Sequence, residues 1–502
     1  MKATDARPFP QDAFALAGRV RAVMETFVDR IVGPLAAFLG ERTPPAFLDM
    51  EECVQKLFSQ AGGHVVGLVL RLLIEDPVHT LKTMEDARIA DPRKLRNQGW
   101  RDTSVCFLGG VVFHFRTPYV SMDRSGSKGS RRGVGRRGKA GGGFFPILSA
   151  LGIHHRATPA LASLTARLSV RCASFEEATE ALGEHGIDMD AKAVRRLTLH
   201  VGEEALRQRD RRMDAAQNGR PFTNEFAGKR IVISVDGGRV RLREGGQRGR
   251  KGKSGHRRYK TPWREPKILT VYVIDEEGRK VRSFPPLLDG TLGDADATFC
   301  LLVSELVLRG AAEAREIIVT GDGAPWIWNR VDALARALGV PPEKIVRVAD
   351  FYHAVEHLAE IAELVKTFGE AARKTWVKRM RRRLKRGKVD EVIESATKLC
   401  RGRNAKAIGT QIDYFRMRRD LMRYDEFAAR GIPLGSGAVE SAVRRVVNLR
   451  LKGPAIFWRA PSAEAMLHLR AYLKAGRWGE IVNRVMHRSP DGQSGQLRMV
   501  AA

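Results

Sequence analysis

The spacing of apolar positions changes along the chain and divides it into parts. Residues 11–100 repeat apolar side chains at helical spacing and contain few strand signals, although a short strand is expected at 105–115. From residue 229 the apolar positions alternate or run together in short stretches, as strands do. The expected strands are 231–235, 239–243, 268–274, 317–320 and 345–348, with a helix at about 329–338. Residues 353–430 return to helical spacing, and a last helix is expected at about 440–448. This order predicts an α/β core with a mixed sheet and a long helical insertion.

One segment has no pattern that could form a core. Residues 124–143 hold eight glycines, three serines and seven Lys or Arg, so we expect a basic linker over 121–146. The segment contains a formal G-x-G-x-x-G at 133–138. No strand precedes it and no apolar helix follows, so it does not indicate a dinucleotide site.

The region 147–228 is expected to hold two helices joined by a short turn. Ser174 with Glu177 is typical of a capped helix start, Gly186 breaks the apolar pattern, and Asp190 can cap a second helix. This outline fits a DNA-binding helix-turn-helix, in which Lys192, Arg195 and Arg196 would face outward. An ordinary helical hairpin fits the same pattern equally well.

The charge of the chain favours a polyanionic partner. Its 502 residues include 87 Lys or Arg against 57 Asp or Glu, a formal net charge of +30, and the usual partner of such a protein is DNA or RNA. The N-terminus has no apolar signal core, and the apolar run 65–74 is interrupted by Arg71 and short for a bilayer. The five cysteines form no metal-ligand spacing or even disulfide set. We therefore expect a reduced, cytoplasmic, nucleoid-associated protein with no membrane partner.

Three carboxylates stand where open α/β sheets place metal ligands. Asp236 ends the apolar run 231–235, Asp322 ends 316–321, and both are followed by glycine, while Glu440 lies on the later helix. Hard oxygen ligands of this kind suit Mg²⁺ or Mn²⁺, and two such ions can assist an in-line phosphoryl displacement. Each residue also has an ordinary explanation. A strand-end Asp before Gly is common turn chemistry, and Glu440 could pair with Arg444 one helical turn later.

The stretch after the last predicted strand carries two overlapping motifs. Asp350 and His353 could bind DNA or position the scissile phosphate, or they could be a helix cap and a buried histidine. Residues 353–357 also read H-x-x-E-H, the inverted zincin motif, which makes a zinc metallopeptidase a competing hypothesis. The basic composition gives a peptidase no support, and zinc is not expected.

Two dense basic stretches are expected to follow phosphates. Residues 245–264 carry eight Lys or Arg, and residues 373–388 carry ten, with Trp376, Met380 and Leu384 as part of an apolar stripe. Aromatic side chains such as Trp263 could stack on unpaired bases. The candidate DNA contacts of the whole chain are Lys192, Arg195, Arg196, Arg250, Lys251, Lys253, Arg257, Arg258, Asp350, His353, Arg382, Arg383, Arg444 and Arg450.

Four motifs resemble a known family when taken in order. They are Val235-Asp236-Gly237, Gly321–Trp326, Asp350–His353 and Gly431–Ser441, and they are similar to those of the DDE transposases of bacterial insertion sequences, of the ISKra type related to Mutator-like transposases. The resemblance implies a ribonuclease-H-like core, with Asp236, Asp322 and Glu440 as catalytic metal ligands. It also implies nicking at transposon ends, followed by attack of the 3′-hydroxyl on target DNA. Similar proteins often have cysteine pairs before the helix-turn-helix, whereas this chain has only Cys106 nearby.

The sequence thus predicts a Mg²⁺- or Mn²⁺-dependent DNA transposase. It should bind transposon-end and target DNA and act as a homo-oligomer, because two ends must be held together. The alternative is a sequence-specific DNA-binding protein without catalysis. The predicted regions are 1–120, mainly helical; 121–146, linker; 147–228, helix-turn-helix; 229–353 with 431–480, catalytic core; 354–430, helical insertion; and 481–502, tail.

Overall fold

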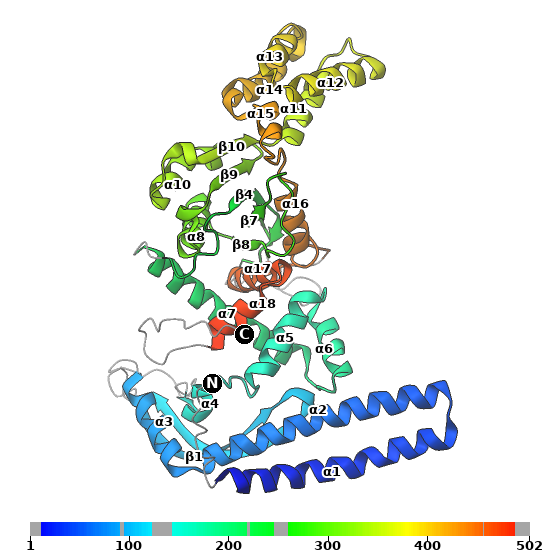
Figure 1. Cartoon of the computed structure of the whole chain (residues 1–502), viewed down its shortest axis with the longest axis vertical. Coiled ribbons are helices and arrows are strands. Elements are labelled where there is room, and N and C mark those ends of the chain that lie inside the picture. Colours follow the sequence, from blue (N-terminus) through cyan, green and yellow to red (C-terminus); the bar gives the residue numbers. More distant parts are fainter. Residues whose placement is uncertain are drawn as a thin grey trace, which may run out of the picture. The chain divides into compact units, whose positions relative to one another are not determined.

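The computed structural model describes residues 12–90, 95–122, 143–217, 221–244, 260–454 and 456–486 (Figure 1). The fold is mixed α/β and rich in helix. Contacts divide the chain into two units, residues 1–201 with 482–502 and residues 202–481. Most of the predicted linker, most of the tail, and Arg250, Lys251, Lys253, Arg257 and Arg258 lie outside the described residues.

The first unit begins with a long helical hairpin, in which α1 (Asp12–Glu41) and α2 (Pro44–Glu75) pack side by side (Figure 1). The Thr43 side chain caps α2 by accepting from the Ala46 N–H at 3.3 Å. The short helices α3 (Pro77–Ala90) and α4 (Pro146–Ala150) pack against each other.

Helix α2 meets the length and composition of a membrane span, alone among the helices of the described residues, and 33% of its most apolar stretch is buried. The apolar run 65–74, which by itself is short for a bilayer, belongs to this longer helix. A core helix of a soluble protein passes the same test, so the finding is weak evidence for a membrane.

A β-hairpin replaces the helix expected up to residue 100 and the one short strand expected at 105–115, whereas most of the described residues up to 120 are helical, as predicted. Strand β1 (Leu95–Cys106) pairs with β2 (Val112–Met122) in antiparallel fashion, and β3 (Gly143–Phe144) pairs with β2. The expected strand spans the turn between them, where Gly109 and Gly110 take φ values of 79° and 75°. The first two thirds of β1 are almost entirely exposed, so its sequence has no apolar alternation to reveal it.

The helices predicted in 147–228 form where their caps indicated. Helix α5 (Pro159–Arg171) is followed by α6 (Phe175–Glu184), whose first turn is capped by Ser174 Oγ, which accepts from the Glu177 N–H at 3.0 Å. Gly186 follows α6 with φ 71°. Asp190 Oδ1 then accepts from the Ala193 N–H at 2.7 Å and opens α7 (Ala191–Ala216).

A five-stranded mixed sheet forms the centre of the second unit, in the order β10-β9-β4-β7-β8 (Figure 1). Its strands are β4 (Arg230–Gly237), β7 (Lys267–Ile274), β8 (Leu287–Thr291), β9 (Glu316–Gly321) and β10 (Ile345–Ala349). Strands β4, β7 and β8 are antiparallel neighbours, whereas β9 and β10 run parallel to β4. Four predicted strands are confirmed. The stretch 239–243 gives only the two-residue strand β5 (Val240–Arg241), paired with β6 (Trp263–Arg264), and β8 was not foreseen.

Helices pack around this sheet. Figure 1 shows α8 (Ala295–Leu308) and α10 (Val331–Leu338) on one side and α16 (Gly437–Val443) on the other. The short α9 (Pro325–Trp328) precedes α10, and a π-helical turn, Arg444–Asn448, follows α16. The chain continues with α17 (Ala460–Ala475), which packs on β8, and α18 (Trp478–Met486).

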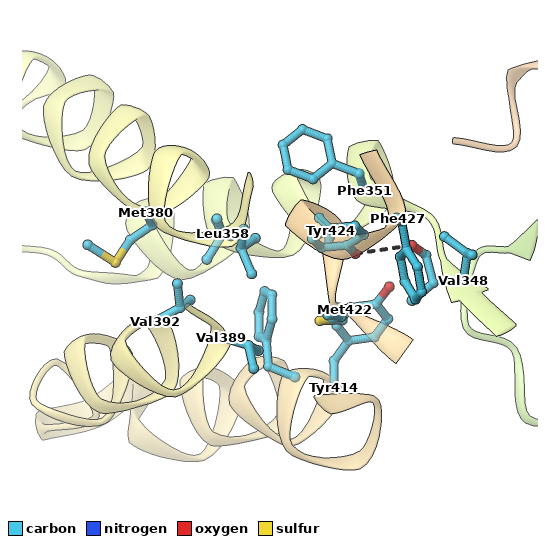
Figure 2. Close-up of a cluster of buried hydrophobic side chains, with 14 of the residues drawn as sticks. Val348, Phe351, Leu358, Met380, Val389, Val392, Tyr414, Met422, Tyr424 and Phe427 are labelled. Atoms are coloured by element: carbon cyan, nitrogen blue, oxygen red, sulfur yellow. Dashed lines mark hydrogen bonds between the residues drawn. The ribbon is translucent and has the colours of Figure 1, made fainter. Parts of the chain in front are cut away.

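The predicted helical insertion forms a group of five helices, whose apolar core (Figure 2) is continuous with sheet residues such as Val232 and Ile318. The five helices are α11 (Phe351–Leu364), α12 (Glu370–Lys385), α13 (Val389–Thr397), α14 (Ala405–Met417) and α15 (Tyr424–Ala429). The basic helix α12 buries Trp376, Met380 and Leu384, the apolar stripe expected from its sequence. The core joins the sheet through Val348 and through Tyr424, whose hydroxyl donates to the Ala349 carbonyl at 3.1 Å.

Candidate functional site

The register of the sheet brings Asp236 and Asp322 together. Strands β4 and β9 run parallel, with Ser234 beside Thr320, an offset of 86 residues. The same offset separates Asp236 from Asp322 (322 − 236 = 86), two residues past the last ladder pair. The two aspartates therefore lie at the carboxyl ends of neighbouring strands.

Glu440 reaches these strands on α16, which packs against β4 and β7. The helix comes close because Gly238 has no side chain. A Cβ at that position would lie 3.1 Å from Val447 and 3.4 Å from Val443. Glu440 and Asp322 are exposed and Asp236 is half-buried, so the carboxylates are open to a ligand from solvent.

The pKa of Asp236 is raised above its ordinary value. Burial is the largest cause, and the negative charges of Asp322, Glu440 and Glu265 add to it. The Gly237 N–H opposes the shift by donating to Asp236 Oδ1 at 2.6 Å. Four carboxylates from four separate segments of the second unit therefore share one electrostatic environment.

Glu265 is the member of this group that sequence reasoning did not select. It lies against the backbone of Gly237, where an added Cβ would be 2.1 Å from Glu265 Oε1. Its side chain is 59% exposed and its nearest cation is Lys267, with 3.8 Å between Nζ and Oε1. Nothing in the spacing of the Glu265-Pro266-Lys267 sequence relates it to Asp236.

The donor set suits a hard divalent cation but is not closed around one. One oxygen of each aspartate is held by backbone: Gly237 N–H for Asp236, and Ala324 N–H, at 3.0 Å, for Asp322. Within the described residues, no group of three Asp, Glu, His or Cys side chains could hold a metal ion as they stand. A cation bound here would draw the neighbouring carboxylates toward Asp236, because its positive charge removes the repulsion that helps to raise the pKa of Asp236.

The turn that carries Asp322 is held by α14. Tyr414 Oη donates to the Asp322 carbonyl at 3.4 Å, and Arg418 Nε donates to the Gly323 carbonyl at 3.0 Å. Gly323 takes φ 96°, and a Cβ there would lie 2.5 Å from Arg418 Nε. The helical insertion therefore shapes the second carboxylate position, a role that no local motif in residues 405–418 indicates.

Asp350 does not fit its assignment as a DNA contact. It is 1% exposed, and Oδ1 caps α11 by accepting from the Tyr352 and His353 N–H groups at 2.6 and 2.9 Å. Oδ2 accepts from the Ser436 N–H. The Ser436 hydroxyl lies 2.5 Å from Asp350 Oδ2 and 3.2 Å from Glu440 Oε1 and can donate to one of them at a time. Asp350 thus anchors the segment that leads into Glu440.

The two histidines of the H-x-x-E-H motif lie on one side of α11, with ring centroids 4.8 Å apart. His357 stacks on Tyr414 at 3.8 Å and its Nδ1 pairs with Gln411, and burial lowers its pKa. His353 Nδ1 lies 3.1 Å from Glu356 Oε2. The His357 ring is thus engaged by α14, and the peptidase hypothesis gains no support from the geometry. His353 is partly exposed and stays a predicted DNA contact.

The remaining predicted DNA contacts differ in accessibility. Lys192, Arg195, Arg196, Arg382 and Arg444 are exposed, and Arg383 is partly exposed, with Nε 3.3 Å from Glu391 Oε2. Arg450 is a correction. It is 4% exposed and its guanidinium lies 5.1 Å from the centre of the Trp458 ring, so it is a core residue in this structure.

A basic cleft lies beyond the tip of β4, where the β5–β6 ribbon meets the start of α17. It encloses about 500 Å³ and is lined by Leu242, Arg243, Glu244, Pro262, Arg264, Arg459, Ala460 and Pro461. Arg459 is the N-cap of α17, whose first amides have no side-chain cap, so the positive end of that helix adds to the three arginines. Beside the cleft, Trp263 is 47% exposed and the Arg241 guanidinium lies 4.7 Å from its ring centre.

Comparisons of the chain with protein-family models, with curated proteins and with solved structures give no match. What the site can do is therefore read from its four carboxylates, from the residues that hold them and from the basic cleft.

Proposed function

We propose that this chain is a DNA transposase of the DDE type, with Asp236, Asp322 and Glu440 as its metal-binding carboxylates. The observation that supports it most is the convergence of these three residues, from two adjacent strand ends and one helix, although they are 86 and 118 positions apart in the sequence (322 − 236 and 440 − 322). Ordinary turn chemistry explains each aspartate alone, but it gives no reason for all three to share one environment.

The arrangement of the sheet also supports a ribonuclease-H-like core. The first three strands are antiparallel neighbours, and the next two join in parallel on the other side of the first. The helical insertion enters after the last strand and ends before the helix that carries Glu440. This is the architecture that the resemblance to DDE transposases implies.

The proposed reaction consists of two phosphoryl transfers. In the first, water attacks the phosphorus of a phosphodiester at a transposon end, and the P–O3′ bond breaks. The water oxygen stays on the phosphate, and the proton passes to the 3′-oxygen, so that the transposon end carries a free 3′-hydroxyl. In the second, that 3′-oxygen attacks a target phosphodiester, and the target's own 3′-hydroxyl is released. Divalent metal ions supply Lewis-acid stabilisation of the attacking and leaving oxygens when bound.

The residues of the chain have distinct parts in this proposal. The carboxylates of Asp236, Asp322 and Glu440 hold the cations, with Glu265 beside them. Tyr414 and Arg418 fix the Asp322 turn, and Asp350 with Ser436 fixes the segment before Glu440. The basic cleft and the exposed arginines of α12 are suited to the phosphate backbone of DNA.

The proposal is tested with the purified full chain and supercoiled plasmid that carries the DNA flanking its gene, in Mn²⁺ or Mg²⁺. We expect specific nicks from the wild-type chain and a loss of at least about 100-fold in Asp236→Ala, Asp322→Ala and Glu440→Gln, because one oxyanion-stabilising group alone contributes that much. DNA affinity should stay within a few-fold. Asp420→Asn, an exposed carboxylate of the helical insertion, is the matched control.

Each other outcome has a defined meaning. Retained nicking in one variant removes that residue from the site. Tight, sequence-specific binding with no nicks from any chain favours a DNA-binding protein without catalysis. A wild-type chain that neither binds nor nicks the flanking DNA overturns the proposal.

A further inference from the structure

The α1–α2 hairpin of the first unit carries an apolar stripe that faces solvent. On α1 the exposed residues Val28, Val32, Leu35 and Leu39 follow one another at intervals of 4, 3 and 4, and are between 41% and 60% exposed. On α2, Leu48, Phe58, Val66 and Val69 are between 38% and 55% exposed, while Phe47, which is 48% exposed, contacts Phe38 of α1. An interval of 4 and 3 is the spacing at which one helix packs its side chains into another.

The two sets of residues lie on the same side of the hairpin. The contacts between α1 and α2 are made by the residues that directly precede exposed ones. Phe27 packs with Leu57, and the rings of Phe38 and Phe47 lie 5.3 Å apart between their centres. One residue further on is a rotation of about 100°. Because α1 and α2 run in opposite directions, the two rotations turn both sets towards the same side. We call these eight residues the hairpin face.

A different side of α2 is already covered. Gly63 and Gly67 lie against Leu108 and Phe113 of the β1–β2 hairpin, where an added Cβ would come within 2.7 and 2.3 Å. Eight side chains that are each about half exposed present on the order of 600 Å² of apolar surface, the upper end of what a soluble monomer leaves uncovered. Two such faces would bury on the order of 1,200 Å², the lower end of a stable interface.

We propose that the hairpin face binds the same face of a second copy of this chain, so that two hairpins form a four-helix bundle across a two-fold axis. The spacing of 4 and 3 on α1 supplies interdigitating side chains, and the buried area lies at the lower end of a stable dimer interface. A lipid surface fits less well. Helices that lie on membranes carry Lys and Arg beside the apolar face, whereas Glu25 and Glu51 are the exposed neighbours one turn from Val28 and Leu48. The inference does not depend on the proposed catalytic function.

The mass of the full chain in solution tests this inference, measured by sedimentation equilibrium at micromolar concentration. We expect the wild-type chain at twice the 55.8 kDa of one chain. Replacing Val32 and Leu39 together by Glu should raise the dimer dissociation constant by at least about 100-fold, because four like charges would be placed in one apolar interface. The milder Val32→Ala with Leu39→Ala should raise it by about 10-fold or more, through lost apolar area.

Two controls separate a dimer effect from misfolding. Leu81→Glu alters a residue of α3 that is 71% exposed and lies outside the hairpin face, and it should leave the mass unchanged. Circular dichroism should show equal helix content in all variants, since Val32 and Leu39 are more than half exposed.

A monomeric wild-type chain at tens of micromolar, or a dimer that persists in the Glu variant, overturns the inference. A monomer that sediments with phosphatidylcholine–phosphatidylglycerol vesicles, and loses that binding in the Glu variant, would assign the face to lipid instead.

Discussion

Asp236→Asn should make the metal-free chain more stable and, at the same time, remove the stabilisation that metal provides. The pKa of Asp236 is raised by burial and by the charges of Asp322, Glu440 and Glu265. A carboxyl whose pKa is higher in the folded than in the unfolded chain holds its proton more tightly when folded. Its charged form therefore opposes folding at neutral pH. The Asn side chain has the same shape but no charge, so it does not oppose folding. What it loses is the negative charge that binds metal.

The size of the effect follows from the sheet. Neighbouring strands lie about 4.8 Å apart, so the carboxylates of Asp236 and Asp322, at adjacent strand ends, come no closer than roughly 5–6 Å if they follow the strand spacing. At that distance a like-charged pair costs about 3 kcal/mol at an effective dielectric constant of 20 and under about 1 kcal/mol in water. Because Asp322 and Glu440 are exposed, we expect Asp236→Asn to gain about 1–2 kcal/mol in EDTA. Saturating Mn²⁺ at 100 times its Kd would add about 2.7 kcal/mol to the wild-type chain alone.

The assay is urea unfolding followed by tryptophan fluorescence, which reports on the second unit because six of the seven tryptophans lie in residues 202–481. The expected order reverses with metal: the variant is the more stable in EDTA and the wild type in Mn²⁺. In EDTA the difference should be present at pH 7.5 and should vanish near pH 4, where the proton returns to Asp236, whose ordinary pKa is 3.8. Asp420→Asn should change neither curve. Equal stability of wild type and variant in EDTA, or equal gains in Mn²⁺, would refute the convergence of charges at this site.

Two further predictions concern the residues around the carboxylates. Asp350→Asn should cost about 2–3 kcal/mol of stability, because the amide has only one oxygen to accept hydrogen bonds and places its NH₂ group opposite buried donors. It should also weaken the stabilisation by Mn²⁺, and Ser436→Ala should weaken it less. An unchanged gain from Mn²⁺ would limit the role of Asp350 to capping α11. Replacing Arg264 and Arg459 together by Ala should weaken DNA binding and reduce the slope of log affinity against log salt concentration by about 2. The control replaces Lys398 and Arg416, two exposed cations of the helical insertion, by Ala. An equal effect of the two double variants would exclude a specific role for the cleft.

Local sequence was enough to find the two aspartates. An apolar run that ends in Asp and Gly predicts a strand end, and strand ends meet at one edge of a sheet. The caps at Ser174 and Asp190 were equally readable, because each depends on residues no more than three positions away. The apolar stripe of α12 was visible within one helix. In all these cases the signal and the structure that it predicts share the same short segment.

What the sequence could not predict depends on contacts between distant segments. Arg450 looks like any other cation until Trp458 and the surrounding core are seen to bury it. Asp350 looks available for DNA until the backbone and hydroxyl of Ser436, 86 residues later, are found on its carboxylate. Glu265 is the opposite case, a residue near the site that the sequence did not select. Nothing in the residues around it in the sequence indicates that it lies against Gly237.

The helical insertion is more than an appendage to the sheet, because two of its helices support the carboxylate site. Its first helix, α11, begins at Asp350, which holds the segment leading to Glu440 through Ser436. Its fourth helix, α14, is followed by Arg418, which holds the turn of Asp322. A change in how the five helices pack would therefore move two of the three carboxylates relative to Asp236, which the sheet fixes by itself. If the insertion also carries DNA on the arginines of α12, the position of that DNA and the geometry of the carboxylates are coupled through one apolar core (Figure 2).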